Sequence, residues 1–467
     1  MTDLAATLRA LVGDDGVLDQ PGDIAGYRGD LARQTAGTIL GVVRPRTTEE
    51  TVGIVKVCAA AGIALTPRGG GTGLAGGAAP VADRAGVVIS FERMRKIRKL
   101  DVVGSIMVVE AGCTLHAVQE AAADAGKLLG LDHGGVSSQV GGNLSTNAGG
   151  NNVLRYGMAR DQVVGLEVVL ADGRVLSQLS PLRKNNAGYD LKQVFLGAEG
   201  TLGLITAAAL RLWPAPIARA TVCLGVATLE AALELFVRAQ ASLGEAISAF
   251  EIMPREGLAL HFAHVRKWRE PFATQTPWLI LLEADSASSY FDLARAVEEL
   301  FAVALEDGLV VDGMVAATEA QRTALWALRE GIAVAMIETP GSLKNDTAVP
   351  VAAVCDFVAR ARAVVEQVVP GCIPVPFGHV GDGNIHFNVL PPAPMMADDF
   401  KTHWADLTRA IEDVALGLGG TVSAEHGIGS LKRSALRRMR SSAELDAMQV
   451  LKSAFDPRDI FNPGKIL

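Results

Sequence analysis

The sequence predicts an α+β protein with two or three domains, because two regions of the chain carry different patterns of apolar residues. Its 467 residues exceed what one hydrophobic core usually organises. Residues 1–215 combine short strands and helices with glycine-rich loops, whereas strands alternate with long helices from residue 216 to about residue 370, within a second domain expected at 216–455. Pro214 and Pro216 mark the boundary between the two regions.

The composition is that of an ordered chain with many buried residues. Apolar residues make up 49% of the sequence and charged residues 20%. The net charge of −8 and the absence of basic runs argue against a nucleic-acid partner. No stretch of about 18 consecutive apolar residues occurs, and the first residues lack the pattern of a signal peptide. The five cysteines are scattered without metal or redox spacing, so we expect buried thiols and a cytoplasmic protein.

The first region begins with a predicted strand, helix and second strand that lead into a glycine-rich loop. Residues 41–45 are predicted as the first strand. Thr47 and Glu50 form a capping box for a helix that ends at Gly62. Residues 63–66 form the second strand.

The loop that follows is Pro67-Arg68-Gly69-Gly70-Gly71-Thr72-Gly73. Its glycines permit positive φ and close backbone approach, so that several N–H groups can converge on an anion. A P-loop would carry a lysine here, and a Rossmann fingerprint would follow the first strand instead of the second. The loop therefore predicts phosphate or pyrophosphate binding, with an ordinary connecting loop as the alternative.

A second glycine-rich loop is predicted at residues 141–150. It follows expected strands at 87–91 and 106–110 and an expected helix at 115–126. Ser138 and the hydroxyl and carboxamide side chains of the loop form a dense set of short polar groups. Such a set suits a buried polar ligand, and a decorated surface loop is the alternative.

Elsewhere the pattern predicts a hairpin at 164–179 that turns at Asp172-Gly173. In the second region it predicts helices at 229–243 and 289–307 and a strand at 278–283. These elements favour an antiparallel sheet covered by helices.

The two glycine-rich loops, together with residues 197–203 and 461–465, resemble the FAD-linked oxidoreductases of the vanillyl-alcohol oxidase type. The resemblance covers nearly the whole chain. It implies a two-part FAD-binding domain of the PCMH type, an α+β substrate domain with an antiparallel sheet, and a C-terminal tail at 456–467 that returns to the flavin domain. Within the superfamily the chain is most similar to the D-2-hydroxyacid dehydrogenases, which include D-2-hydroxyglutarate dehydrogenases.

The resemblance implies that both loops and the other matching segments bind FAD. The expected contacts are Pro67, Arg68, Gly69, Gly70, Gly71, Thr72, Gly73, Ser138, Gly142, Asn143, Thr146, Asn147, Gly149, Gly150, Glu199, Gly200, Gly203, Ile205 and Asn462. Thr72 stands in the loop where members with covalent flavin often carry histidine. The FAD is therefore expected to be non-covalent.

Two histidines flank a predicted turn in the second region. Asp382-Gly383 is a favoured turn dipeptide, and a two-residue hairpin centred on it places His379 opposite His386. Cross-strand partners have Cβ atoms about 4.5–5.5 Å apart, which is close enough for two ligands of one metal ion. Asn388 projects from the same face. A pair of neutral core histidines is the alternative.

Glu425 and His426 could complete this site. Two histidines and one carboxylate are a ligand set of open zinc sites. Gly427 and Gly429 allow the bend that two adjacent residues need to reach one site. The resemblance implies that Glu425 is the third Zn²⁺ ligand after the two histidines, and that His426 is the catalytic base.

The resemblance also implies the substrate contacts. Arg329 matches the family's arginine for the substrate carboxylate, and Asn388 is expected to contact the substrate too. Lys344 matches the lysine with which hydroxyglutarate dehydrogenases bind the distal carboxylate. The implied reaction transfers the hydroxyl proton to His426 and the Cα hydride to flavin N5. Ala333 replaces a threonine of the hydroxyglutarate enzymes, which leaves D-malate open beside D-2-hydroxyglutarate.

Other activities remain open at this point. Within enzymes the alternative is a D-lactate dehydrogenase or the flavin subunit of a glycolate oxidase, and outside them a flavin-free subunit. The resemblance implies an electron-transfer flavoprotein or a quinone as the electron acceptor. A homodimer is expected as a common outcome.

Overall fold

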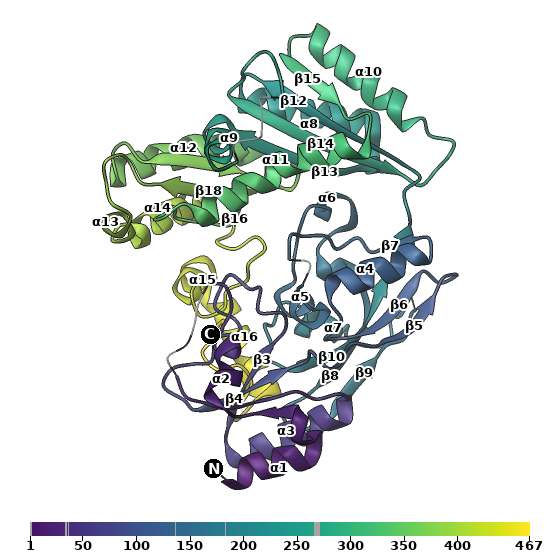
Figure 1. The fold of residues 1–467 in the computed structure, drawn as a ribbon, viewed down its shortest axis with the longest axis vertical. Helices are drawn as coiled ribbons and strands as arrows, with labels where there is room; N and C mark the ends of the chain where they lie inside the picture. Colours follow the sequence, from purple (N-terminus) through teal and green to yellow (C-terminus); the bar gives the residue numbers. More distant parts are fainter. Residues whose placement is uncertain (1, 33–34, 36, 136, 183, 266–270) are drawn as a thin grey trace. The chain divides into compact units, whose positions relative to one another are not determined.

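The computed structural model describes residues 2–32, 35, 37–135, 137–182, 184–265 and 271–467. The chain forms two compact units (Figure 1). The first unit consists of Met1–Gly150, Gly157–Ala215 and Glu425–Leu467. The second unit consists of Asn151–Tyr156 and Pro216–Ala424.

The first unit contains a four-stranded sheet with the order β1-β2-β4-β3. Its middle and outer strands β2, β4 and β3 run parallel, and β1 pairs with β2 in the antiparallel sense. The strands are β1 (Val17–Leu18), β2 (Ile39–Val43), β3 (Ala64–Arg68) and β4 (Gly86–Ser90).

Helix α3 (Thr48–Ala61) connects β2 to β3. The Glu50 N–H donates to the Thr47 hydroxyl at the start of α3, at 3.2 Å, and Gly62 ends the helix with φ 65°. The predicted order of strand, helix, strand and glycine loop is confirmed. The first unit also contains the helices α1 (Thr2–Val12), α2 (Pro21–Ile24), α7 (Lys192–Phe195), α15 (Arg433–Met439) and α16 (Ser442–Phe455).

The second sheet of this unit is antiparallel and has the order β5-β6-β10-β8-β9. Helices α4 (Leu115–Asp124) and α5 (Val140–Thr146) share a core with it. A short ladder of two strands pairs β7 with β11. The strands are β5 (Ile97–Asp101), β6 (Ile106–Glu110), β7 (Lys127–Leu128), β8 (Val163–Val169), β9 (Val175–Gln178), β10 (Leu204–Arg211) and β11 (Trp213–Pro214).

Helix α5 occupies part of the segment that was predicted as the second glycine-rich loop. Val140 and Leu144, one helical turn apart, are buried in the core of the five-stranded sheet. Asn147 ends the helix in the left-handed region with φ 52°. The loop prediction was wrong for residues 141–146, because burial of this apolar pair outweighs the low helix propensity of the two glycines between them.

The second unit is built on an antiparallel sheet with the order β13-β14-β12-β15. Alternate residues of its strands face opposite sides. Ile280 and Leu282 join the core with α8 and α10, whereas Leu279 and Leu281 join the core with α9 and α11. The elements are α8 (Leu229–Leu243), α9 (Arg255–His264), α10 (Leu293–Glu306), α11 (Glu319–Glu338), β12 (Ala218–Val226), β13 (Ile247–Pro254), β14 (Trp278–Ser286) and β15 (Asp312–Val315).

A smaller sheet with the order β16-β18-β17 belongs to the same unit. Helices α12 and α14 pack against each other, and both supply residues to the core that contains β18. The elements of this part are α12 (Val354–Val368), α13 (Ala397–Lys401), α14 (Trp404–Gly417), β16 (Thr347–Ala348), β17 (Ile373–Phe377) and β18 (Asn384–Leu390). The short helix α6 (Val153–Tyr156) packs against β13 of the larger sheet.

The division between the units differs from the expected one near the C-terminus. Residues 425–455 were expected in the substrate domain, but they belong to the first unit. The backbone explains this placement, because the Ser430 N–H donates to the Ala75 carbonyl at 3.1 Å and the Ile466 N–H donates to the Gly429 carbonyl at 3.0 Å.

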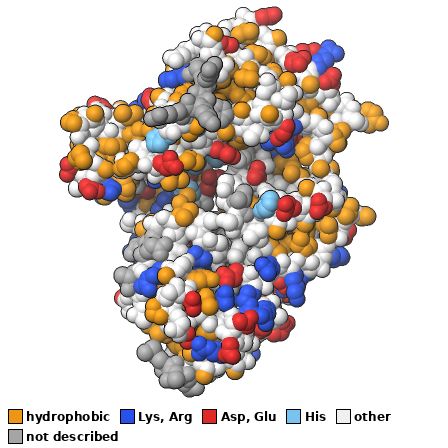
Figure 2. Space-filling view, in the orientation of Figure 1, with side chains coloured by type: hydrophobic (Ala, Val, Ile, Leu, Met, Phe, Trp, Pro, Cys, Tyr) orange, Lys and Arg blue, Asp and Glu red, His pale blue; other side chains and the backbone are white. Residues whose placement is uncertain are grey.

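Within the described ranges of the chain, no helix combines the length and the apolar character needed to cross a membrane. Figure 2 shows acidic and basic side chains interspersed with apolar ones on the face drawn. The expected cytoplasmic location stays a prediction.

Candidate active site

The first unit contains a cavity at its glycine-rich loop. His426 lines the cavity together with most of the residues that were predicted to contact FAD. These are Pro67, Arg68, Gly69, Gly70, Gly71, Thr72, Gly73, Ser138, Gly142, Asn143, Thr146, Glu199, Gly200, Gly203, Ile205 and Asn462.

The other three predicted FAD contacts, Asn147, Gly149 and Gly150, have different neighbours. The Arg160 N–H donates to Asn147 Oδ1 at 2.9 Å. The Gly150 N–H donates to Glu425 Oε1 at 2.6 Å, and a Cβ added at Gly149 would collide with the same carboxylate. Gly149 and Gly150 therefore lie directly against the Glu425 carboxylate.

The glycine loop after β3 lies directly against the chain at the start of α5. A Cβ added at Gly70 would lie 2.6 Å from the Ser137 carbonyl oxygen, and one added at Gly69 would lie 3.5 Å from the Gly142 Cα. Gly71 takes φ 73°, in the region that favours glycine. The close approach explains Gly70, and the positive φ explains Gly71.

Two buried acceptors in the cavity wall fit a ligand that carries N–H or O–H groups. Among the described residues, Gln139 Oε1 and Asn462 Oδ1 have no hydrogen-bond partner, and both side chains line the cavity. The Asn462 amide group itself donates to the carbonyls of Gly77 and Glu199, at 3.0 and 2.7 Å. A buried acceptor without a donor costs about 1–3 kcal/mol. The ring and ribityl groups of FAD include donors of the required kind.

Glu199 fixes the loop that carries His426. Its carboxylate accepts hydrogen bonds from the Ile428 N–H at 2.7 Å and the Gly429 N–H at 2.8 Å. Burial raises the pKa of the Glu199 carboxyl, and the two N–H groups oppose this shift. Gly427 takes φ 78° and Gly429 takes φ 50°, so the loop has the bend that the sequence suggested.

In the second unit, a buried carboxylate joins two of the predicted site residues. Glu251 on β13 is 1% exposed. Its Oε1 lies 2.7 Å from His379 Nδ1, and its Oε2 accepts a hydrogen bond from Arg329 Nε at 2.7 Å. Burial alone would raise the pKa of this carboxyl, but the charges of His379 and Arg329 outweigh it and lower the pKa to about 2. Glu251 therefore acts as an ionised acceptor for both side chains.

His379 and His386 lie close together, with ring centroids 5.6 Å apart. They are not cross-strand partners, because β17 and β18 pair Phe377 with His386. The prediction of a two-residue turn at Asp382-Gly383 was wrong, since Val380–Asp382 form a short 3₁₀ helix within the connection.

The reason for this longer connection lies on the neighbouring strand β13. The Ile252 N–H donates to the Gly378 carbonyl at 2.9 Å, and the Gly378 N–H donates back at 3.2 Å. This bridge draws the chain from β18 to β13 directly after Phe377. His379 follows the bridge and thereby reaches Glu251.

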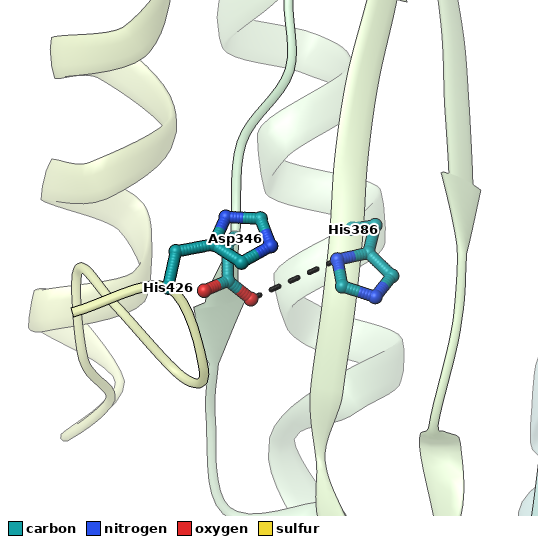
Figure 3. Close-up of side chains that lie close together, drawn as sticks. All are labelled: Asp346, His386 and His426. Atoms are coloured by element: carbon teal, nitrogen blue, oxygen red, sulfur yellow. Dashed lines mark ion pairs between the residues drawn. The ribbon is translucent and has the colours of Figure 1, made fainter. Parts of the chain in front are cut away.

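The acidic residue Asp346 lies close to His386. Asp346 Oδ1 lies 3.7 Å from His386 Nδ1 (Figure 3). Asp346 is 1% exposed, and the Asn384 side chain donates to the same oxygen at 3.1 Å. Asn384 thus holds the carboxylate next to the imidazole.

Two further residues of this unit, Asn388 and Lys344, were predicted to contact the substrate. Asn388 is buried, and its Oδ1 accepts a hydrogen bond from the Asn345 N–H at 3.0 Å. Lys344 is exposed. Within the described part of the chain, no acidic group forms an ion pair with Lys344 within 4.0 Å.

Sequence reasoning missed Glu251 and Asp346. Glu251 stands inside the apolar segment Ile247–Pro254, and a carboxylate in such a segment is a signal for a buried charge with a partner. Asp346 lies two residues after Lys344 and carried no comparable signal.

Comparison with known protein families also indicates a protein that binds FAD. The family described as "FAD linked oxidases, C-terminal domain" matches residues 215–466, and the family described as "FAD binding domain" matches residues 39–178. The chain belongs to the FAD-linked oxidases. The fold also matches a solved structure of p-cresol methylhydroxylase with a TM-score of 0.78 at 18% identity, covering 100% of this chain and 96% of that one.

Two relatives of this FAD-linked oxidase match over its full length. The mitochondrial D-2-hydroxyglutarate dehydrogenase of Bos taurus is 37% identical, over 100% of this chain and 83% of the relative. The D-2-hydroxyglutarate dehydrogenase of Stutzerimonas stutzeri (strain A1501) is 36% identical, over 100% of this chain and 99% of the relative. The PCMH-type fold expected from the sequence is confirmed.

The close approach at Gly70 generates a prediction for FAD binding. We expect Gly70→Ala to weaken FAD binding roughly 5- to 150-fold, because overpacking of this kind typically costs about 1–3 kcal/mol. The ratio of flavin absorbance to protein absorbance after dialysis measures the loss. Gly22→Ala is the matched control, since a Cβ at Gly22 meets nothing within 4 Å. Wild-type FAD affinity in Gly70→Ala would contradict the assignment of this loop.

Proposed function

We propose that this FAD-linked oxidase is a dehydrogenase that oxidises D-2-hydroxyglutarate to the 2-oxo acid. Its full-length relatives with this name support the proposal. The observation that carries it is the cluster in the second unit, where one buried carboxylate contacts both Arg329 and His379 and a second imidazole lies 5.6 Å from the first. A cation and two imidazoles in one place suit an α-hydroxy carboxylate bound to a metal ion.

The donor set of the second unit fits Zn²⁺. Imidazole nitrogens are common zinc ligands, and His379 and His386 are the two ligands that we propose. Because His379 Nδ1 contacts Glu251, its other nitrogen, Nε2, is the one that would hold the metal. Glu425 as third ligand stays a prediction.

The cofactors supply the difficult chemistry when they are bound, since Zn²⁺ lowers the pKa of a coordinated hydroxyl and FAD takes up the hydride from Cα. The side chains of the protein bind and orient the substrate. Arg329 binds the α-carboxylate, and its guanidinium is held by Glu251 and by the Phe377 ring, whose centroid lies 5.0 Å away. His426 accepts the hydroxyl proton.

Lys344 binds the distal carboxylate in this proposal. Lys344 is an exposed residue, and the described residues provide no acidic partner for its ammonium group. A substrate carboxylate would supply that partner. The electron acceptor, an electron-transfer flavoprotein or a quinone, is proposed from the family resemblance alone.

The direct test is anaerobic mixing of the holoenzyme with a panel of D- and L-2-hydroxy acids. D-2-hydroxyglutarate should reduce the flavin faster than its L-enantiomer, D-lactate and glycolate, with loss of flavin absorbance as the measurement. Faster reduction by D-malate would shift the proposal to the shorter diacid. Reduction by D-lactate alone would contradict it.

The contribution of Lys344 can be isolated by substitution. Lys344→Met should lower kcat/KM for D-2-hydroxyglutarate roughly 10- to 150-fold, because a charge-assisted contact contributes about 1.5–3 kcal/mol. The value for D-lactate should stay nearly constant, since a mono-acid never uses the contact. Lys401→Met is the control, because Lys401 is an exposed lysine of the same unit that pairs with Asp398 at 2.8 Å. Equal slowing of both acids would make Lys344 structural.

His426 can be tested separately from the metal. His426→Ala should slow flavin reduction about 10²–10⁴-fold, the usual cost of losing a general base, while zinc content stays at the wild-type level. Stopped-flow reduction and metal analysis measure the two quantities. His116→Ala, an exposed histidine of the first unit, should change neither. Loss of zinc from His426→Ala would identify His426 as a ligand instead.

Because position 72 is not a histidine, we expect FAD to be bound without a covalent bond to the protein. Acid or heat denaturation should release the flavin into the supernatant, because Thr72 offers no imidazole for attachment. Absorbance of the supernatant after centrifugation measures the release. Flavin that stays with the precipitated protein would contradict non-covalent binding.

A further inference from the structure

In the proposed function Glu251 binds neither the metal nor the substrate, yet each of its oxygens contacts a residue that does. Oε1 lies 2.7 Å from His379 Nδ1, and Oε2 lies 2.7 Å from Arg329 Nε. These partners stand 128 and 78 residues away in the chain. With 1% exposure, the carboxylate has little access to water.

The contact with His379 determines which ring nitrogen is available to a metal. The 2.7 Å contact joins His379 Nδ1 to a carboxylate oxygen, which accepts, so a neutral imidazole in this contact carries its proton on Nδ1. The lone pair is then on Nε2, the nitrogen that faces away from Glu251. Carboxylate–histidine pairs of this kind orient the ring and raise the basicity of the ligating nitrogen.

The contact with Arg329 determines the plane of the guanidinium group. Glu251 accepts from Nε, and the Phe377 ring lies 5.0 Å from the guanidinium carbon. The guanidinium group of Arg329 is planar. Contacts with Glu251 and with the Phe377 ring therefore fix the orientation of its terminal N–H groups. Phe377 is also two residues before His379, so both halves of the arrangement share one short segment.

We propose that Glu251 is a positioning residue that holds the metal-binding nitrogen of His379 and the carboxylate-binding edge of Arg329 in one arrangement. The inference rests on the proposed function. It predicts that metal affinity and substrate affinity depend on the same carboxylate, although that carboxylate binds neither ligand.

A general structural role is the competing explanation, and the chain contains a matched control for it. Glu283 on β14 is also buried, at 3% exposure. Its carboxylate accepts from Arg322 Nε at 2.7 Å and from the Trp326 indole N–H at 2.8 Å. Arg322 and Trp326 lie on α11, the helix that carries Arg329. Glu283 thus holds the same helix against the same sheet without contacting a proposed ligand or substrate residue.

The experiment compares Glu251→Gln with Glu283→Gln in the FAD-loaded enzyme. Glutamine keeps the shape but replaces one carboxylate oxygen by an NH₂ group, which only donates, so one of the two contacts with His379 and Arg329 loses its acceptor. Zn²⁺ affinity is measured after chelator treatment by competition with a chromogenic chelator. Steady-state kinetics with D-2-hydroxyglutarate at saturating Zn²⁺ give kcat and KM, and thermal unfolding monitors the fold.

We expect Glu251→Gln to weaken Zn²⁺ binding 10- to 100-fold, the usual effect of losing a group that orients a metal ligand. KM should rise as well, because Arg329 loses its fixed orientation. Glu283→Gln should keep the wild-type Zn²⁺ affinity, even if its unfolding temperature falls equally.

Equal loss of Zn²⁺ affinity in both variants, or none in Glu251→Gln, would overturn the inference and leave the proposed function intact. A wild-type protein that oxidises D-2-hydroxyglutarate without binding Zn²⁺ would overturn the inference together with the metal site. Should Glu251→Gln fail to fold, Glu251→Asp and Glu283→Asp form the next pair, with the same outcomes. Aspartate keeps the charge but withdraws the carboxylate by one methylene group.

Discussion

The position of helix α11 depends on two buried carboxylates of the sheet beneath it. A charge removed from water costs several kcal/mol unless partners compensate it. Glu283 and Glu251 lie on neighbouring strands of one sheet and find their partners on α11. Because Arg322, Trp326 and Arg329 are spaced at i, i+4 and i+7, they lie on one face of the helix and can serve both carboxylates. A shift of the helix by one turn would leave at least one charge uncompensated.

Carboxylates also hold the loops of the first unit in place. Glu199 accepts from the backbone of Ile428 and Gly429, and Glu425 accepts from the backbone of Gly150. Backbone N–H groups in irregular segments need an acceptor as much as those in helices do. A carboxylate that accepts two of them fixes a segment that has no ladder of its own. The loop with His426 therefore has a defined shape in the cavity wall.

The residues with a proposed chemical role lie largely on irregular segments next to rigid elements. His379 follows the end of β17, and Lys344 lies between α11 and β16. His426 lies in the segment that Glu199 holds. Loops carry chemistry well when a scaffold restricts them, because the reacting groups then need little reorganisation. Here the restriction comes mainly from buried acidic side chains, which explains why acidic residues without a catalytic role occur so close to the site.

What the sequence by itself determined is local. Caps and glycine conformations act within a few residues, so helix α3, with Thr47 at its start and Gly62 at its end, followed from the sequence. The family and its fold followed from motifs for the same reason, since each glycine loop is a continuous segment.

Only the tertiary structure decided the rest. A turn dipeptide predicted a tight hairpin at Asp382-Gly383, but a bridge to Ile252, more than one hundred residues earlier in the chain, imposed a longer connection. The glycines of α5 predicted a loop, but burial against a distant sheet stabilised a helix. The partner of His379 lies 128 residues away. Burial of charge and of apolar surface depends on which strands become neighbours, and no local pattern contains that information.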